Sequence, residues 1–238
     1  MRASAGNDGG MAMRPVIFLS TAISLVLLVL LPFLYAGLMT ASLAKLHISP
    51  PVAALLVIAI VLGGFINIPI TRVVHTEQLP VSPLAMFGLD QLFPRLSRRR
   101  RETVIAVNVG GCLIPLGIAI YQLSYLADRG PSLLLKTAIA ALFTTGVCYL
   151  LARPVQGLGI AMPGFVPPIV AALSAVLLAP DQAPPVAFVA GVVGPLVGAD
   201  LLHLKDVNRI ATTGVASIGG AGTFDGIVLS GILSAYLA

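Results

Sequence analysis

Apolar residues follow one another along this chain in long runs, with few polar positions between them. Six stretches contain about the 20 residues that a helix needs to cross a bilayer, and one shorter run is a seventh candidate. In chain order they are 16–38, 52–70, 103–126, 133–152, 165–179 (the shorter run), 185–204 and 213–237. The runs lack the ten-residue alternation that is typical of membrane β-barrels. The pattern predicts an all-α, polytopic membrane protein with about seven transmembrane helices.

The composition supports this class. Hydrophobic residues make up 58% of the chain and charged residues 10%, whereas a soluble domain has about 25% charged residues. Residues 14–238 are therefore expected to form a single transmembrane domain, and the small, polar residues 1–13 to be disordered. Cys112 and Cys148 both lie inside apolar runs. Neither has the neighbours of a metal site, and we expect no metal and no cofactor.

Basic residues are distributed unequally between the two sides that seven spans would create. One side has Lys45, Arg129 and Lys136; the other has Arg2, Arg14, Arg72, Arg95, Arg98, Arg99, Arg100, Arg101, Arg153, Lys205 and Arg209. Cytoplasmic segments carry the excess of Lys and Arg. This predicts a cytoplasmic N-terminus, a cytoplasmic loop over 71–102 and a C-terminus outside. Because Arg98, Arg99, Arg100 and Arg101 lie beside a membrane span, we expect them to contact anionic lipid, not nucleic acid.

Several polar side chains lie near the cytoplasmic ends of the predicted spans. Asp200, Asn67 and Asn108 are at a similar depth on three different spans, and ionisable residues inside spans usually face the protein interior or water. They are expected to line a polar vestibule, unless each faces a separate backbone group or interfacial water. Arg72 could pair with Asp200 and keep it ionised. His203, on the same helical face as Asp200, could pass protons near neutral pH.

Asp225 lies near the midpoint of the last predicted span, inside the sequence SIGGAGTFDGIVLSG. The glycines of this segment, Gly219, Gly220, Gly222 and Gly226, each disfavour a helix by up to about 1 kcal/mol. A broken helix here, with Ser217 and Thr223 beside the carboxylate, is typical of ion and substrate sites in transporters. The alternative is that the glycines allow close helix packing. We expect the last span to be broken at this segment.

Five segments of the chain resemble a known family of bacterial and archaeal membrane proteins. They read NIP, VNVGGCLIP, LARPVQGLGI, GADLLHL and ASIGGAGTFDGIVLSGIL. They resemble domain-of-unknown-function family 1614 over about residues 50–238. The resemblance implies a compact multi-pass protein of the cytoplasmic (inner) membrane and no particular chemistry.

A weaker likeness is to the presenilin and signal-peptide-peptidase proteases, which use two aspartates on consecutive helices. Here GADLLHL is similar to the first of their motifs and GAGTFDG to a stretched form of the second. The likeness implies that Asp200 and Asp225 form a catalytic pair that activates water. Thr223 and Phe224 interrupt the second motif, however, and no Pro-Ala-Leu triplet follows. The two carboxylates also differ in depth if the last helix is continuous.

Three functions are therefore open. Ion- or proton-coupled transport of a small solute would use Asp225 as its central site. The substrate or ion site would include Asp200, Asn67, Asn108, Arg72, His203, Ser217, Thr223, Gly220 and Gly222. The alternatives are an intramembrane aspartyl hydrolase with Asp200 and Asp225 as its catalytic pair, and a non-catalytic assembly protein. Glycine-rich helix faces leave a homo-oligomer open.

Overall fold

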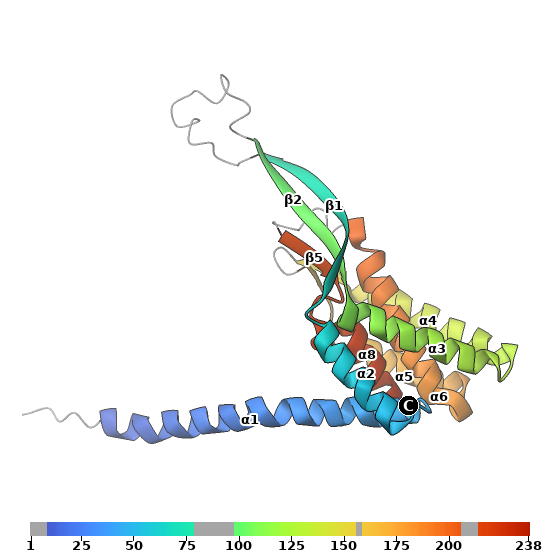
Figure 1. Cartoon of the computed structure of the whole chain (residues 1–238), viewed down its shortest axis with the longest axis horizontal. Helices are drawn as coiled ribbons and strands as arrows, with labels where there is room; N and C mark the ends of the chain where they lie inside the picture. Colours follow the sequence, from blue (N-terminus) through green and yellow to red (C-terminus); the bar gives the residue numbers. More distant parts are fainter. Residues whose placement is uncertain (1–8, 79–97, 156–158, 206–213) are drawn as a thin grey trace, which may run out of the picture.

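Most of the chain is helical, as predicted. The computed structural model describes residues 9–78, 98–155, 159–205 and 214–238, which the coloured ribbon of Figure 1 follows. Their α-helices are α1 (Gly9–Lys45), α2 (Pro50–Gly63), α3 (Ile114–Ala127), α4 (Pro131–Leu151), α5 (Val166–Leu178), α6 (Ala183–Val193) and α8 (Gly226–Leu237). Wider π-turns, η2 (Val109–Leu113) and η4 (Gly194–Leu201), precede α3 and follow α6. α1 begins at Gly9, inside the segment 1–13 that was expected to be disordered.

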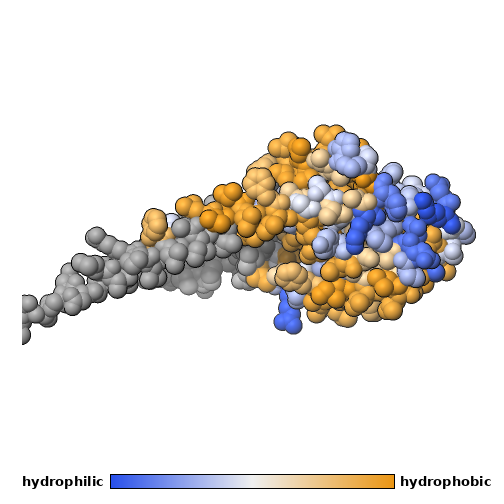
Figure 2. Space-filling model, turned by 90° about the horizontal axis from the view of Figure 1, so that it is seen from below, coloured by the Kyte–Doolittle hydropathy of each residue, from blue (hydrophilic) through white to orange (hydrophobic). Residues whose placement is uncertain are grey.

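Four helical segments of the described residues are long and apolar enough to cross a membrane. They are Ser24–Lys45, Val109–Ala127, Pro131–Leu151 and Pro180–Leu201. The apolar helices Pro50–Gly63, Val166–Leu178 and Gly226–Leu237 are shorter. A total of seven transmembrane helices thus stays a prediction. On the face shown in Figure 2, apolar residues cover most of the helical bundle.

The prediction of an all-α chain is wrong at one end of the bundle, where three strands form a mixed sheet in the order β1-β2-β5. These strands are β1 (Asn67–Gln78), β2 (Arg98–Asn108) and β5 (Gly214–Ile218). β1 and β2 pair antiparallel from Asn67 opposite Asn108 to Gln78 opposite Arg98, and β5 pairs parallel to β2. A second, two-stranded sheet joins β3 (Arg153–Val155) to β4 (Gly159–Ala161).

The sheet corrects the second and third predicted spans and the predicted loop 71–102. α2 ends within the glycine pair of Gly63 and Gly64, where glycine disfavours helix. Pro69 follows and cannot donate a helical hydrogen bond. The stretches 70–76 and 103–107 are rich in valine, isoleucine and threonine, which favour strands. Both ends of the expected loop are therefore strand, and residues 79–97 lie outside the described part.

All strands lie at the same end of the bundle, which we call the sheet end (Figure 1). α2 and η4 end there, and η2 and α8 begin there. The turns between α1 and α2 and between α3 and α4 are at the opposite end, which we call the far end. Strands β1 and β2 extend as a long arm away from the helices. This alternation places β1, β2, β3 and the end of η4 at one end of the bundle. That this end faces the cytoplasm stays a prediction.

The last predicted span is broken, as expected. Residues 214–218 form β5, a glycine-rich turn follows, and α8 has only 12 residues. Asp225 consequently lies at the N-terminus of α8 and not at the midpoint of a helical span. The physical reason is that strand pairing with β2 satisfies the backbone of the first half of the segment, which its glycines disfavour as helix.

The bundle core is built on α6, which is buried from Val186 to Val192. It packs closely on α8 because small residues face each other: a Cβ at Gly191 would meet the backbone of Ser230, and one at Gly231 would meet Val192. Ser234 Oγ donates to the carbonyl oxygen of Ala187 at 2.9 Å. Such close approach is how helices associate where lipid removes the hydrophobic drive.

Candidate functional site

Three polar side chains join the three strands where they meet the helices. Asn108 Nδ2 donates to the carbonyl oxygen of Gly64 (2.8 Å) and to Oδ1 of Asn67 (3.0 Å). Its Oδ1 accepts from the backbone N–H of Gly111 (2.7 Å), which caps η2. Ser217 Oγ, from β5, donates to the same Asn67 oxygen at 2.6 Å. Sequence reasoning expected Asn67 and Asn108 at one depth; the structure brings them into direct contact and adds Ser217.

Beside this network, three backbone segments touch without side chains between them. A Cβ on Gly111 would overlap the carbonyl oxygen of Gly219, and a Cβ on Gly110 would overlap the end of α2. A Cβ on Gly222 would lie 3.1 Å from the Cα of Gly64. We call this contact the glycine junction (Gly63, Gly64, Gly110, Gly111, Gly219 and Gly222). It fixes the turn before Asp225 against the start of η2.

The turn itself requires glycine at two positions. Gly219 and Gly222 have φ of 72° and 60°, the left-handed region that other residues rarely adopt. Asp225 then caps α8: Oδ1 accepts from the backbone N–H of Ile227 (3.0 Å) and Oδ2 from that of Ala221 (3.4 Å). An aspartate in this position satisfies backbone donors that a helix N-terminus leaves free. Asp225 is half-buried.

Asp200 approaches the same turn from another element. It lies near the end of η4, half-buried, and its carboxyl lies near the backbone N–H of Gly219, in the turn that precedes Asp225. Cys112, buried in η2, lies against the same turn at Gly219. The broken last segment therefore removes the difference in depth between the two aspartates that a continuous helix would impose.

His203 and Arg72 take different positions. The His203 ring is buried, with Nδ1 3.1 Å from the carbonyl oxygens of Gly198 and Ala199, and it packs on the ring of Tyr149. Because those carbonyls can only accept, Nδ1 carries the proton. Arg72 lies in β1, opposite Val104 of β2. Its pairing with Asp200 stays a prediction.

α1 contacts the turn that carries Asp225. Tyr35 donates its hydroxyl hydrogen bond to the carbonyl oxygen of Thr223 at 2.8 Å, and its ring stacks on Phe224 with centroids 5.3 Å apart. Thr223 thus contributes its backbone to this contact. Gly220 is exposed in the same turn, next to Ser217.

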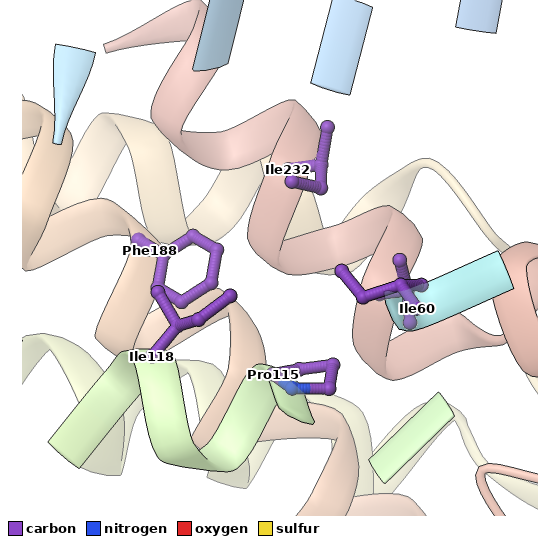
Figure 3. A pocket seen from close by; sticks show the side chains of 6 residues that line it. Ile60, Pro115, Ile118, Phe188 and Ile232 are labelled. Carbon is purple, nitrogen blue, oxygen red and sulfur yellow. The ribbon is translucent and has the colours of Figure 1, made fainter. Parts of the chain in front are cut away.

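A narrow gap in the bundle lies between α2, α3, α6 and α8. Its lining is apolar and includes Ile60, Phe188 and Ile232 (Figure 3), and it has no room for a water molecule. Neither Asp200 nor Asp225 lines it. It is a packing defect of the core and gives no water path to the carboxylates.

The motifs of this end of the bundle lie within a known family. A family model described as "Protein of unknown function (DUF1614)" matches residues 61–237, well over half of the chain. The chain belongs to the DUF1614 family. This match includes the glycine junction, the polar network and both aspartates, and confirms the family resemblance that the sequence motifs indicated. The comparisons with curated proteins and with solved structures found no match. With its apolar helices, the DUF1614 chain is a membrane protein.

Sequence reasoning missed Tyr35 and most of the glycine junction. A signal was present: Gly–Gly pairs occur at 63–64, 110–111 and 219–220, each within three residues of one member of the polar network. Such repetition indicates backbone contact, because only glycine allows two backbones to approach so closely. Tyr35 had no signal, since a tyrosine near a helix end is also typical of the membrane interface.

Proposed function

We propose that this protein is an aspartyl hydrolase that cleaves peptide bonds of extended substrates, with Asp200 and Asp225 as its catalytic pair. The observation that supports this most is the break in the last segment: it places Asp225 at the N-terminus of α8, and Asp200 approaches the turn that precedes Asp225 from η4. Two carboxyls that are close together hold one proton between them, because two like charges repel. Such a pair contains one base and one acid.

The two carboxyls would divide the reaction between them. The ionised carboxyl takes a proton from a water molecule as the water oxygen bonds to the peptide carbon. The protonated carboxyl gives its proton to the carbonyl oxygen. When the C–N bond breaks, the proton taken from water passes to the departing amine nitrogen, and one hydroxyl of the intermediate returns its proton to the carboxylate that had donated one. One carboxylic acid and one amine result, and the pair again holds one proton. Asp225, which two backbone N–H groups hold in place, is the better candidate for the base.

The neighbouring strand supports an extended peptide as the substrate. β5 leads directly into the turn before Asp225, and among the described strands it pairs only with β2. Its other edge can pair with an added strand, a common way to bind extended peptides. The outer edge of β1 is less suitable, because Pro69 lacks an N–H and the register shifts between Pro69 and Thr71.

The test uses purified protein in lipid vesicles that contain a single-span test peptide, in water enriched in ¹⁸O. Mass spectrometry should find fragments whose new carboxyl carries one ¹⁸O atom. Asp200→Asn and Asp225→Asn should each lower the yield at least 100-fold. Asp181→Asn, an exposed carboxylate at the far end, is the matched control and should retain full activity. Full activity in either site variant would overturn the proposal, and so would the absence of labelled fragments from a panel of test peptides.

Ion- or proton-coupled transport is the second candidate. The feature that favours it is the discontinuous last segment, whose α8 begins at a carboxylate, as half-helices do at transporter sites. In vesicles that enclose a pH-sensitive dye, the wild-type protein would then dissipate an imposed proton gradient and Asp225→Asn would not. The dye measurement and the fragment measurement thus separate the two candidates.

A further inference from the structure

Three helices of the bundle are too short to cross a bilayer alone, and each continues into a strand at the sheet end. α2 is followed by β1, α8 is preceded by β5, and α5 is preceded by β4. At about 1.5 Å per residue, the 14 residues of α2 extend about 21 Å. The hydrocarbon core is about 30 Å thick. The residues next to each short helix therefore have to fill the remaining thickness.

Polar and aromatic side chains mark the membrane surface at the far end. Lys45 Nζ donates to the carbonyl oxygen of Tyr236 at 2.6 Å. The Tyr125 ring stacks on His47 (4.9 Å between centroids), and the Arg129 guanidinium lies 3.4 Å from its centre. Tyrosine and cationic residues are typical of the boundary between acyl chains and water.

The length of η2 and α3 gives the distance from the far-end membrane boundary to the glycine junction. From Tyr125 back to Val109 the helix rises about 24 Å at about 1.5 Å per residue. This is about 6 Å short of the hydrocarbon thickness, and any helix tilt increases the deficit. A strand rises about 3.3 Å per residue, so the first residues of β1 fill the gap. The opposite boundary then lies between Ile68 and Arg72.

The side chains of residues 65–70 are apolar and exposed, as lipid-facing side chains at this depth should be. Phe65 is 82% exposed, Ile66 54%, Ile68 46% and Ile70 64%. They continue the exposed apolar surface of α2, where Leu55 is 65% exposed, without interruption by a charge until Arg72. In water this continuous strip would be an unusually large exposed apolar patch.

We propose that the bilayer surface at the sheet end crosses the sheet close to Arg72, so that residues 65–70 contact lipid acyl chains. The second predicted span is then a helix–strand hybrid, and the polar network and glycine junction lie below the headgroups. This proposal does not depend on the proposed function.

Few polar backbone groups should be unpaired when residues 65–70 lie in lipid. Open strand edges are not tolerated in hydrocarbon because their polar groups lack partners. Here the carbonyl oxygen of Ile66 accepts from the backbone N–H of Val109 (3.0 Å), and Pro69 has no N–H. The outer edge groups of β1 between Ile68 and Arg72 lie, in this arrangement, at the depth where acyl chains meet headgroups. The Arg72 guanidinium suits the lipid phosphates at that level.

The chain contains no tryptophan, so a single introduced tryptophan reports its own depth. Four variants are compared in phosphatidylcholine vesicles: Phe65→Trp and Ile68→Trp in the segment, Leu55→Trp in α2, and Gln78→Trp at the end of β1. Lipids brominated along the acyl chain quench fluorescence by contact, and iodide quenches from water. Phe65→Trp and Ile68→Trp should behave as Leu55→Trp does, with blue-shifted emission and at least half of it lost to brominated lipid. Gln78→Trp should be quenched by iodide alone.

The opposite result is equally clear. If Phe65→Trp and Ile68→Trp emit as in water and iodide quenches them as strongly as Gln78→Trp, the boundary lies at the glycine junction and the proposal is wrong. Phe65→Trp keeps an aromatic side chain at a highly exposed position. It therefore provides a folded reporter even if Ile68→Trp does not fold.

Discussion

At the scale of single residues, Asn108 is the polar side chain with the most structural contacts in the site. It is fully buried, donates to two acceptors and accepts from one donor. These bonds connect α2, β1 and η2 in one place. Buried amides that satisfy several partners fix a single arrangement, because a partial set of bonds is costly in a low-dielectric interior.

Asn108→Ala should therefore destabilise the protein by roughly 2 to 4 kcal/mol, since it leaves the buried N–H of Gly111 and the half-buried carbonyl of Gly64 without this partner. Asn67→Ala is the matched control, because Asn67 is exposed and accepts only from side chains, and Asn108 keeps its bonds to Gly64 and Gly111 without it. It should cost roughly 1 kcal/mol or less. Denaturant unfolding in detergent micelles measures both, and equal losses would contradict the argument.

His47 has an unusual backbone conformation for a residue other than glycine. It has φ of 60°, the left-handed region, whereas the other described residues with positive φ are glycines. The backbone N–H groups of His47 and Ile48 donate to Ala44 and Leu43, which is the hydrogen-bond pattern that glycine usually closes at a helix C-terminus.

His47→Gly and His47→Ala both remove the stacking on Tyr125, but only alanine retains the left-handed strain. The glycine variant should be more stable than the alanine variant by about 1 kcal/mol. The comparison needs only two unfolding curves under identical conditions. An alanine variant as stable as the glycine variant would show that the turn relaxes to another conformation.

At the scale of elements, the sequence predicted the helices that cross the bundle and missed those that end early. The predicted spans 133–152 and 165–179 agree with α4 and α5 to within two residues at each end. Long apolar runs give a strong helical signal. The spans 52–70 and 103–126 were wrong at the sheet end, because an apolar run does not distinguish a strand from a helix.

The candidate site was predictable in part. Asn67 and Asn108 were expected at a shared depth, because both lie near the same ends of two neighbouring predicted spans, and the structure brings them into contact. On a continuous last helix, Asp225 would lie about 10 Å below Asp200. The glycines predicted a break in this helix, but not that β5 replaces its first half. Pairing of β5 with β2 joins residues more than 100 positions apart, and no local pattern encodes such a pairing.

The glycine junction gives a prediction at this scale. Gly111→Ala places a methyl group against the carbonyl oxygen of Gly219, which should push η2 and the turn apart and cost about 1 to 3 kcal/mol. Gly117→Ala in α3 is the control, since a Cβ there would meet nothing within 4 Å. That variant should be as stable as the wild type or more stable, as is usual for an exposed helical glycine. Thermal unfolding measures the stability of both variants. If the two variants were equally stable, the backbone contact between Gly111 and Gly219 would be contradicted.

At the scale of the whole molecule, the sheet end and the far end have opposite character. The sheet end carries the described strands with Asp200 and Asp225, and β1, β2 and β3 bring Arg72, the arginines 98–101 and Arg153 there. The far end carries short turns with Lys45 and Arg129. By the excess of Lys and Arg in cytoplasmic segments, we expect the sheet end to face the cytoplasm.

The orientation can be measured with fusions placed after Ala238 and inside the segment 79–97. A reporter that fluoresces only in the cytoplasm should be bright at 79–97 and dark after Ala238, and an alkaline phosphatase, active only outside, should give the inverse result. Moving one reporter between the two sites keeps expression and host constant. The same reporter active at both sites would contradict an odd number of crossings between them.

The backbone contact at the glycine junction also restricts how the aspartates can move. A side chain between two elements can change rotamer and let one element shift, but bare backbones in contact have no such freedom. The turn that carries Asp225 can therefore separate from η2 only as a rigid piece, with α8 behind it. Opening of the site would be a hinge displacement of the last segment, on the slow timescale of collective motions, and local rearrangement of side chains would not suffice.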